Sequence, residues 1–289
     1  MTGEKNKKEI KNILKNKVVL VTGGAGSVGS VIISKLLEYP VNSVRALDWN
    51  EHALFNLKNS LNDERFRPLL GNIIDLERIE MAMSGVDIII HTAAVKNIEI
   101  TEFNPMETIE VNTIGTMNLI KSVIKHKPEI FINISTDKAA EPSTIYGSTK
   151  QLGERVTSWA GKHILSTKFS TVRLGNIIET RGNVFEIWEK ELKAKKPLSI
   201  TDPLMERYFF HVSEATDFIL NCLKLTDKGE VFVPKMKLQK IVDLATKLSK
   251  NHKNIGIRQG EKLQEILMSD IEKEVAIERK DMWIIKNYQ

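Results

Sequence analysis

A tyrosine and a lysine four residues apart, with an acid and a second base just upstream, are the residues of this chain best suited to chemistry. Tyr146 and Lys150 stand in the stretch Tyr-Gly-Ser-Thr-Lys, and this spacing places both side chains on one face of a helix. A nearby ammonium group stabilises phenolate over phenol, so Tyr146 could act as a base near neutral pH. Asp137 and Lys138, in Ser-Thr-Asp-Lys, add groups that simple alcohol oxidation does not require. The set therefore predicts an oxidation followed by an elimination.

The first quarter of the chain carries the pattern of a dinucleotide site. An expected buried strand over 17–22 is followed by Gly-Gly-Ala-Gly-Ser-Val-Gly at 23–29 and by an expected helix over 30–37. The glycines permit a tight turn, close approach of a pyrophosphate and close packing of helix on strand, and amides at the helix start would hold the phosphates. The residues expected at the pyrophosphate are Gly23, Gly26, Ser27, Val28 and Gly29.

An acidic residue at the end of the next apolar run predicts which dinucleotide binds. Asp48 follows the run 44–47 and lies 19 residues after Gly29. A carboxylate there can accept hydrogen bonds from both ribose hydroxyls and would repel a 2′-phosphate, so NAD is predicted in preference to NADP. The alternative is that Asp48 only caps the helix that follows it.

Strands and helices are expected to alternate through most of the chain. Further strands are predicted over 66–70, 86–91, 130–135 and 171–174, and helices near 50–61, 75–84, 105–126 and 146–162. This alternation predicts an α/β fold with a doubly wound parallel sheet of the Rossmann type, which binds ligands at the carboxyl ends of its strands. The expected domains are a dinucleotide-binding domain over 1–175, to which 213–233 returns, and a substrate-binding lobe formed by 176–212 and 234–289.

Composition is that of a compact cytoplasmic enzyme. The 289 residues suffice for one large α/β domain with a smaller lobe, and 42 basic against 37 acidic residues give a net charge of +5. The Lys-rich start has interspersed Glu and no aromatics, so we expect a solvated helix and no nucleic-acid site. No apolar segment suits a membrane span. Cys222 stands in a helical apolar pattern and is expected in the core, while the six His show no ligand spacing and predict no metal site.

Several longer motifs resemble those of one family. They include Thr-Gly-Gly-Ala-Gly-Ser-Val-Gly at 22–29, Ser-Thr-Asp-Lys-Ala-Ala at 135–140, Arg-Leu-Gly-Asn at 173–176, Thr-Asp-Pro-Leu-Met-Glu-Arg at 201–207 and Gly-Ile-Arg-Gln-Gly-Glu-Lys at 256–262. The chain resembles the extended short-chain dehydrogenase/reductases. More narrowly, it resembles the soluble UDP-N-acetylglucosamine 4,6-dehydratases of flagellar, capsular and surface-polysaccharide biosynthesis.

This resemblance implies an NAD-dependent lyase that acts on a UDP-sugar and often inverts carbon 5. The catalytic residues it implies are Thr136, Asp137, Lys138, Tyr146 and Lys150. Further cofactor contacts are expected from Asn72, Ile73, Ala93, Ala94, Lys96 and Asn112. Substrate contacts are expected from Lys96, Asn176, Arg207, Arg258 and Glu261.

Within this mechanism we expect each group of the motif to have its own step. Tyr146 takes the proton of the 4-hydroxyl group, and Lys150 lowers the pKa of Tyr146. Lys138, held neutral by neighbouring positive charge, removes the proton on carbon 5, and a protonated Asp137 donates to the departing 6-hydroxyl. Two long helices, 105–126 and 146–162, commonly pair across a dimer axis in the superfamily, so a homodimer or higher homo-oligomer is expected.

The chain departs from the family pattern at three places, and several roles have other interpretations. Asn97, Asn72 and Gln259 replace the usual residues of Lys-His, Gly-Asp and Arg-Pro-Gly. The alternatives are a surface ion pair for Asp137 with Lys138, a solvated Lys96, stacking of Arg207 on the aromatics at 208–210, a helix-start pair for Arg258 with Glu261, and polar packing for Asn112. The alternative functions are a UDP-sugar 4-epimerase, which needs neither Asp137 nor Lys138, and a dinucleotide-sensing binding protein.

Overall fold

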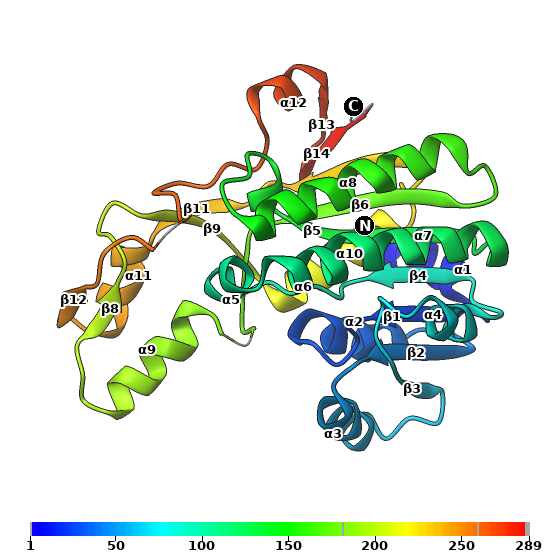
Figure 1. Ribbon diagram of the computed structural model, residues 1–289, viewed down its shortest axis with the longest axis horizontal. Coiled ribbons are helices and arrows are strands. Elements are labelled where there is room, and N and C mark those ends of the chain that lie inside the picture. Colours follow the sequence, from blue (N-terminus) through cyan, green and yellow to red (C-terminus); the bar gives the residue numbers. More distant parts are fainter. Residues whose placement is uncertain (1, 181, 259, 287–289) are drawn as a thin grey trace.

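One large, mostly parallel sheet forms the centre of the protein (Figure 1). The computed structural model describes residues 2–180, 182–258 and 260–286. Within these residues the strands of this sheet run in the order β13-β14-β10-β6-β5-β4-β1-β2-β3. Their bounds are β1 Val18–Thr22, β2 Ser43–Asp48, β3 Phe66–Leu70, β4 Ile88–His91, β5 Ile130–Thr136, β6 Lys168–Leu174, β10 Lys228–Pro234, β13 Ala276–Glu278 and β14 Met282–Ile285.

The order and direction of the strands confirm the predicted doubly wound α/β fold. All neighbours from β3 to β10 are parallel. The chain moves outward from β1 to β3 and then returns to β4 on the other side of β1, so the carboxyl ends of β1 and β4 form the switch point where such sheets bind nucleotides.

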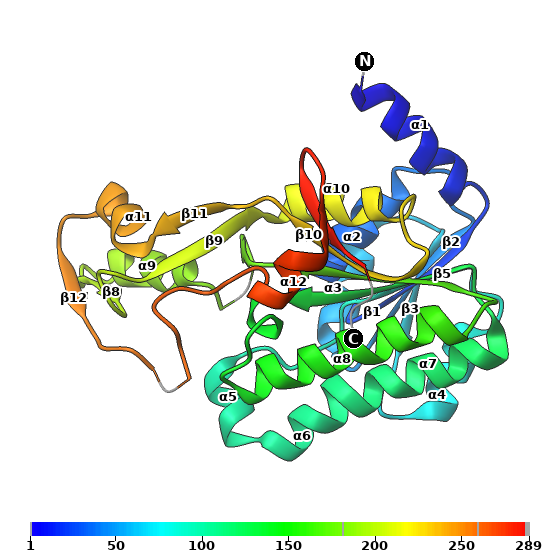
Figure 2. The ribbon, with the colours of Figure 1, turned by 90° about the horizontal axis from the view of Figure 1, so that it is seen from above.

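Helices cover both faces of the sheet, as Figure 2 shows from above. One face is packed by α1 (Thr2–Leu14), α2 (Ser27–Leu37), α3 (Glu51–Leu61) and α10 (Val212–Cys222). The other is packed by α4 (Leu76–Met83), α7 (Gly115–His126) and α8 (Ile145–His163). Apolar residues recur at helical spacing on the inward faces, as with Ile32, Ile33 and Leu36 of α2, and their burial supplies most of the stability of the fold. Cys222 is buried in this core, as predicted.

The helix predicted over 105–126 is confirmed, and it contains a π-helical turn. α6 (Pro105–Ile109) continues through this turn, η1 (Glu110–Ile114), into α7, and the short helix α5 (Ile98–Phe103) precedes it. The buried Asn112 lies in this turn, and its side-chain amide both donates to the carbonyl of Val95 and accepts from its N–H, at 2.9 and 2.8 Å. The π-turn thus aims one polar side chain at the loop that follows β4.

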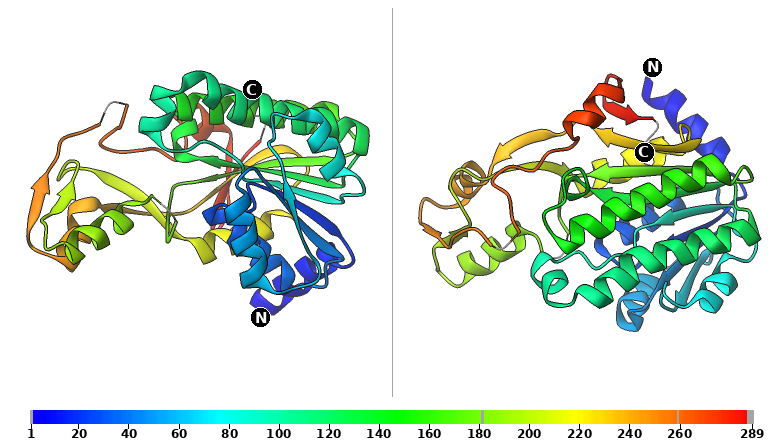
Figure 3. Two further views of the ribbon diagram at one scale, coloured as in Figure 1. Left: turned by 60° about the horizontal axis from the view of Figure 1, so that its bottom comes forward. Right: turned by 45° about the horizontal axis from the view of Figure 1, so that its top comes forward.

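A smaller lobe extends beyond the carboxyl edge of the large sheet, at the left of Figure 1 and in both views of Figure 3. Its helices are α9 (Val184–Lys193) and α11 (Ile241–Leu248). Its strands are β7 (Asn176–Ile178), β9 (Glu206–His211) and β11 (Lys237–Lys240) in one sheet, and β8 (Leu198–Ile200) and β12 (His252–Asn254) in another. The lobe has its own apolar core around the fully buried Trp188.

The end of the chain returns to the large sheet, which corrects the domain boundaries expected from sequence. After α12 (Asp270–Val275), β13 and β14 pair antiparallel with each other and with β10, although 234–289 was assigned to the lobe. The return covers the edge of β10, which would otherwise expose unpaired backbone groups. Residues 287–289 lie outside the described part of the chain.

No helix within the described ranges combines the length and apolar character needed to cross a bilayer. Nor do His, Cys, Asp and Glu side chains gather there in a group able to hold a metal ion.

A buried ionic cluster joins the sheet, α8 and the C-terminal segment. The Arg173 guanidinium on β6 donates to both carboxylate oxygens of Glu154 on α8, at 2.6 and 3.0 Å, and to both of Glu272 on α12, at 2.7 and 2.8 Å. It also donates to the carbonyl of Leu267 at 2.9 Å. The two carboxylates raise the pKa of Arg173 against the effect of its burial. This cluster fixes where three segments meet.

Breaking this cluster should therefore destabilise the fold strongly. We expect Arg173→Met to lower the free energy of unfolding by about 3–5 kcal/mol, because it leaves two buried carboxylates without their cation. Urea denaturation followed by circular dichroism measures this difference. The control is Lys193→Ala, which removes the exposed pair with Glu189 and should cost less than about 0.5 kcal/mol. A loss below about 1 kcal/mol for Arg173→Met would contradict this account.

Candidate active site

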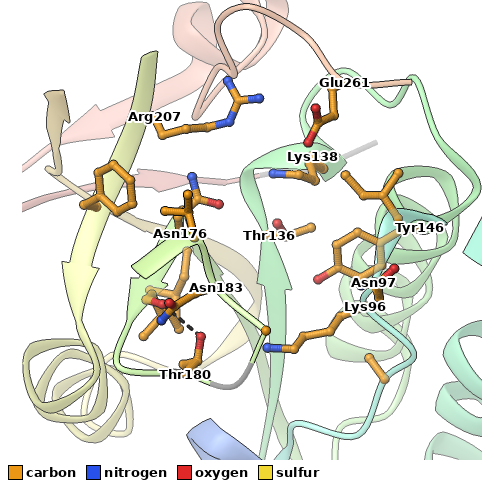
Figure 4. Close-up of a pocket in the computed structure, with 18 of the residues that line it drawn as sticks. Lys96, Asn97, Thr136, Lys138, Tyr146, Asn176, Thr180, Asn183, Arg207 and Glu261 are labelled. Carbon is orange, nitrogen blue, oxygen red and sulfur yellow. Dashed lines mark hydrogen bonds between the residues drawn. The ribbon is translucent and has the colours of Figure 1, made fainter. Parts of the chain in front are cut away.

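A cavity of about 420 Å³ lies between the carboxyl edge of the large sheet and the lobe. Figure 4 shows side chains converging on it from the end of β5, the start of α8, the loop after β4, and the strands and C-terminal loop of the lobe. Of the predicted site residues, those that line it are Val28, Ala94, Lys96, Thr136, Lys138, Tyr146, Lys150, Asn176, Arg207, Arg258 and Glu261.

The first turn of α8 is held tightly against the segment that follows β5. Thr144 caps this helix by accepting from the N–H of Gly147, and Glu102 accepts from the N–H of Ile145 at 2.7 Å. A Cβ atom at Gly147 would lie 2.6 Å from the carbonyl oxygen of Lys138, so only glycine permits this approach. The close packing brings Tyr146 beside the Thr-Asp-Lys motif, and Figure 4 shows its hydroxyl group directed toward Thr136.

The phenol of Tyr146 has a pKa shaped by opposing effects. Burial raises this pKa, the charge of Lys138 and a hydrogen bond with Thr136 oppose the rise, and the Asp137 carboxylate adds to it. The positive charge that favours phenolate therefore comes from Lys138, whereas the sequence spacing assigned that effect to Lys150.

Lys150 lies one turn further along α8 and is buried, as the spacing predicts. Its burial lowers the pKa of the ammonium group to about 8, an effect that the Glu154 carboxylate partly opposes. Its lowered pKa means that Lys150 changes charge close to neutral pH.

Lys138 differs from the expected neutral amine. Its Nζ lies 3.1 Å from Asp137 Oδ1 and 3.4 Å from Glu265 Oε1, and both carboxylate side chains are buried. Although burial lowers the pKa of Lys138 and Arg207 opposes its charge, the two carboxylates raise this pKa overall. The expectation that positive neighbours hold it neutral is wrong, because its nearest charged partners are negative.

Asp137 is buried behind the cavity wall. It follows β5 in the short 3₁₀ helix η2 (Asp137–Ala139), and its Oδ1 accepts from Thr136 Oγ1 at 2.9 Å and from Lys138. Its Oδ2 has no hydrogen-bond partner among the described residues, and the side chain is not part of the cavity lining. The surface ion pair considered as an alternative is wrong, because the carboxylate is fully buried.

The glycine-rich turn has the form that a dinucleotide pyrophosphate requires. Gly23 has φ +64°, and a Cβ atom at Gly29 would lie 2.4 Å from the Gly23 carbonyl oxygen. α2 begins after Gly26 with no side-chain cap, so the positive end of the helix dipole faces this turn, as it does at anion sites. These features fit the phosphates of a dinucleotide.

Asp48 ends β2 next to this turn. Its carboxylate accepts from the N–H of Ala25 and from the N–H of Asn50, both at 3.0 Å. The first bond ties the carboxylate to the glycine-rich turn. The helix after it is capped by the Asn50 side chain, so the alternative role of Asp48 as that cap is wrong.

The remaining cofactor candidates lie around the same edge. Asn72 follows β3 and accepts from the N–H of Ile74, while the Ile73 side chain is buried in the core, so only its backbone could meet a ligand. Ala93 packs against the glycine-rich turn, since a Cβ atom at Gly23 would lie 2.7 Å from its backbone.

Lys96 extends into the cavity from the loop that Asn112 holds (Figure 4). The protein around it lowers the pKa of the Lys96 ammonium, which argues against a fully solvated side chain. Asn97 caps α5 by accepting from the N–H of Ile100 and lines the same cavity.

The predicted substrate residues differ in how many of their polar groups already bind other parts of the protein. Asn176, at the start of β7, lines the cavity (Figure 4). The Arg207 guanidinium donates to the carbonyls of Glu206, Leu263 and Lys262, so most of its terminal N–H groups are committed to the backbone rather than to aromatic stacking or a diphosphate.

The C-terminal loop supplies the other two candidates. Arg258 pairs with Glu99 of α5 at 3.4 Å across the cavity mouth, and its backbone N–H approaches the Glu261 carboxylate at 3.4 Å. The helix-start pair considered as an alternative is wrong, because no helix begins among the described residues of this loop. Gln259, the departure within this motif, lies outside the described residues.

Sequence reasoning missed the lobe residues Thr180 and Asn183, which line the cavity, and Glu265, which contacts Lys138 behind the cavity wall. Glu265 follows the motif at 256–262 by three residues, and this closeness to the motif was the available signal. Because Glu265 is far from Lys138 along the chain, residue spacing could not predict their contact.

Comparison with known proteins gives a family match over most of the chain. A family described as polysaccharide biosynthesis protein matches residues 19–287. An uncharacterised membrane protein of Methanocaldococcus jannaschii is 38% identical over 97% of this chain and 89% of its own length. A UDP-N-acetylglucosamine 4,6-dehydratase (inverting) of Campylobacter jejuni is 35% identical, over 93% and 82%.

Relatives with another name also match. A UDP-glucose 4-epimerase of Rickettsia rickettsii is 31% identical over 93% of this chain and 83% of its own length. Among solved structures, Pen from Bacillus thuringiensis superposes with a TM-score of 0.90 at 33% identity, covering 94% of this chain and 88% of that one.

The geometry at Asp48 predicts cofactor preference. We expect NAD to bind more tightly than NADP, because a 2′-phosphate would meet the Asp48 carboxylate. In Asp48→Asn, which keeps the shape but removes the charge, the ratio of the two dissociation constants should fall by about tenfold. Isothermal calorimetry measures both constants, and a wild-type preference for NADP would show the assignment to be wrong.

Proposed function

The chain belongs to the polysaccharide biosynthesis protein family, within the extended short-chain dehydrogenase/reductases, and we propose that it is a UDP-N-acetylglucosamine 4,6-dehydratase. The product would be a UDP-4-keto-6-deoxy sugar, formed with or without inversion at carbon 5. The coarser function, modification of a sugar nucleotide for polysaccharide biosynthesis, is common to the relatives named dehydratases and epimerases.

The observation that carries the dehydratase proposal is the position of Lys138. It lines the same cavity as Tyr146 and is held there by two buried carboxylates. A 4-epimerase removes and returns hydrogen at carbon 4 only, so it has no use for a second acid–base group beside the tyrosine. A binding protein without turnover would need neither group.

NAD fits the glycine-rich turn and Asp48, and when bound there it would supply the hydride chemistry that oxidises and later reduces the sugar. The chain's own residues would manage the protons. Tyr146, as phenolate, takes the proton of the 4-hydroxyl group, and Thr136, which lines the same cavity, would hydrogen-bond the same oxygen. A ketone at carbon 4 then acidifies the proton on carbon 5.

Of the two titratable groups in its motif, Asp137 and Lys138, it is Lys138 that lines the cavity. We propose that its amine, in the neutral form, takes the carbon-5 proton, and that the resulting ammonium returns a proton to the departing 6-hydroxyl group. The bonds broken are C5–H and C6–O, a C5=C6 double bond forms, and the hydroxyl leaves as water. The later reduction adds a hydride at carbon 6 and a proton at carbon 5. Asp137, buried behind Lys138, then orients the amine and is not itself the acid.

Incubation of the protein with UDP-N-acetylglucosamine tests the function. Dehydration predicts a product one water lighter by mass spectrometry, with a 4-keto group. Appearance of UDP-N-acetylgalactosamine at unchanged mass would establish epimerisation instead.

Loss of Tyr146 and of Lys138 should stop different steps. Tyr146→Phe should abolish substrate-dependent reduction of the cofactor, measured by absorbance. Lys138→Met should still permit that oxidation, at a reduced rate because the charge that favours the Tyr146 phenolate is lost, but solvent deuterium should not enter carbon 5 and water loss should fall by about 100-fold or more.

The variant Asp137→Asn tests whether Asp137 or Lys138 donates the proton to the departing 6-hydroxyl group. If Lys138 handles both protons, carbon-5 exchange and water loss should change together in this variant. Exchange that persists while water loss falls would instead show that Asp137 is the acid. Full turnover in both the Asp137 and Lys138 variants would exclude the elimination mechanism.

We further propose that the protein forms a homodimer through α7 and α8, which lie side by side on one face of the molecule (Figure 1). Large apolar side chains are exposed on these helices and the segments before them: Phe103, Met106, Ile114, Ile124, Leu152 and Trp159. Such a surface is typical of an association site. Sedimentation velocity tests this proposal, and a monomer at micromolar concentration would refute it.

A further inference from the structure

Lys138 receives a carboxylate from a distant part of the chain. Glu265 lies in the C-terminal segment and is 4% exposed, and its Oε1 is 3.4 Å from Lys138 Nζ. Asp137 Oδ1 lies 3.1 Å from the same nitrogen. Lys138 thus carries one positive charge between two buried negative charges.

The fold fixes Glu265 at this place through the backbone on its N-terminal side. Arg207 on β9 donates to the carbonyls of Lys262 and Leu263, at 2.8 and 3.0 Å. Gln264 forms a parallel bridge with Glu206, also on β9. The contact is therefore built into the packing of the segment against the lobe, and it does not rest on a flexible surface side chain.

The charged and titratable groups that face Lys138 come from four segments. Asp137 precedes it in η2, Tyr146 is on α8, Arg207 is on β9 and Glu265 is in the C-terminal segment. Arg207 opposes the charge of Lys138, whereas Asp137 and Glu265 favour it. Asp137 also accepts from Thr136, whereas Glu265 directs its carboxylate to Lys138.

We propose that Glu265 is a positioning residue that fixes Lys138 as an ammonium ion in the cavity wall and thereby sets the pH range in which this group can remove a carbon-bound proton. The consequence for reaction rests on the dehydratase function proposed above. Because an ammonium ion cannot act as a base, proton removal depends on the small neutral fraction of Lys138. Without the Glu265 charge that fraction is larger at any given pH.

Titration of Lys138 by NMR tests this role without any substrate. The protein is labelled with ¹³Cε-lysine, and the Lys138 signal is assigned by its loss in Lys138→Met. In Glu265→Gln the Lys138 pKa should fall by about one to three units, the shift typical of losing an opposite charge at this distance. An unchanged titration in a variant that still binds NAD would overturn the proposal.

A matched control is Glu141→Gln. Glu141 pairs with Lys262 at 3.7 Å, also between the large domain and the C-terminal segment, but its side chain is exposed. This variant should leave the Lys138 titration unchanged. If Glu265→Gln does not fold, Glu265→Asp gives the test, because its shorter side chain should lower the pKa in the same direction by a smaller amount. No change there would also overturn the proposal.

The exchange of solvent deuterium into carbon 5 gives a second measurement. We expect the wild-type rate to rise with pH, and Glu265→Gln to exchange faster than wild type at low pH and to reach its plateau at a lower pH. A purely structural role would slow exchange at every pH, and that result would overturn the proposal. A wild type that never exchanges carbon 5 would instead refute the dehydratase function, while the NMR titration would still decide the role of Glu265.

Discussion

The buried Arg173 guanidinium is the interaction on which the arrangement of the site depends. It binds Glu154 of α8 and Glu272 of α12 while standing on β6, in the middle of the large sheet. α8 carries Tyr146 and Lys150, and the segment that leads into α12 carries Glu265. One side chain therefore places the tyrosine, its neighbouring lysine and the counter-ion of Lys138 relative to the same strands.

The surroundings of two lysines of this site shift their pKa values in opposite directions. Lys150 lies among neutral polar groups with one carboxylate a turn away, so the cost of burying a charge prevails and its pKa is about 8. Lys138 is also shielded from water, but two carboxylates in direct contact outweigh that cost. A lysine whose pKa is lowered toward neutral pH and a second whose pKa is raised are suited to different tasks.

The elements that sequence predicted well are those fixed by local chemistry. The apolar run at 18–22, the glycines after it and Asp48 at the end of β2 specify their own geometry within one strand–turn–helix unit. Contacts between distant segments were not predictable from spacing. Three such contacts depend on how whole elements pack. Glu265 pairs with Lys138, β14 pairs with the edge of β10, and Asn112 forms hydrogen bonds with the backbone of Val95. Arg207 shows the same limit, because its motif suggested a diphosphate whereas its partners are backbone carbonyls.

The site differs from that of a simple alcohol dehydrogenase by what has been added behind the tyrosine. Oxidation at carbon 4 needs a base and a hydride acceptor, and the ends of β1, β5 and α8 supply their positions. Elimination across carbons 5 and 6 needs a further group that can hold a proton while facing the sugar. Burying such a group costs free energy unless an opposite charge accompanies it. Asp137 beside Lys138 provides one such charge within the motif, and the C-terminal segment provides the other through Glu265. The two carboxylates that accompany Lys138 thus come from segments that lie far apart in the sequence.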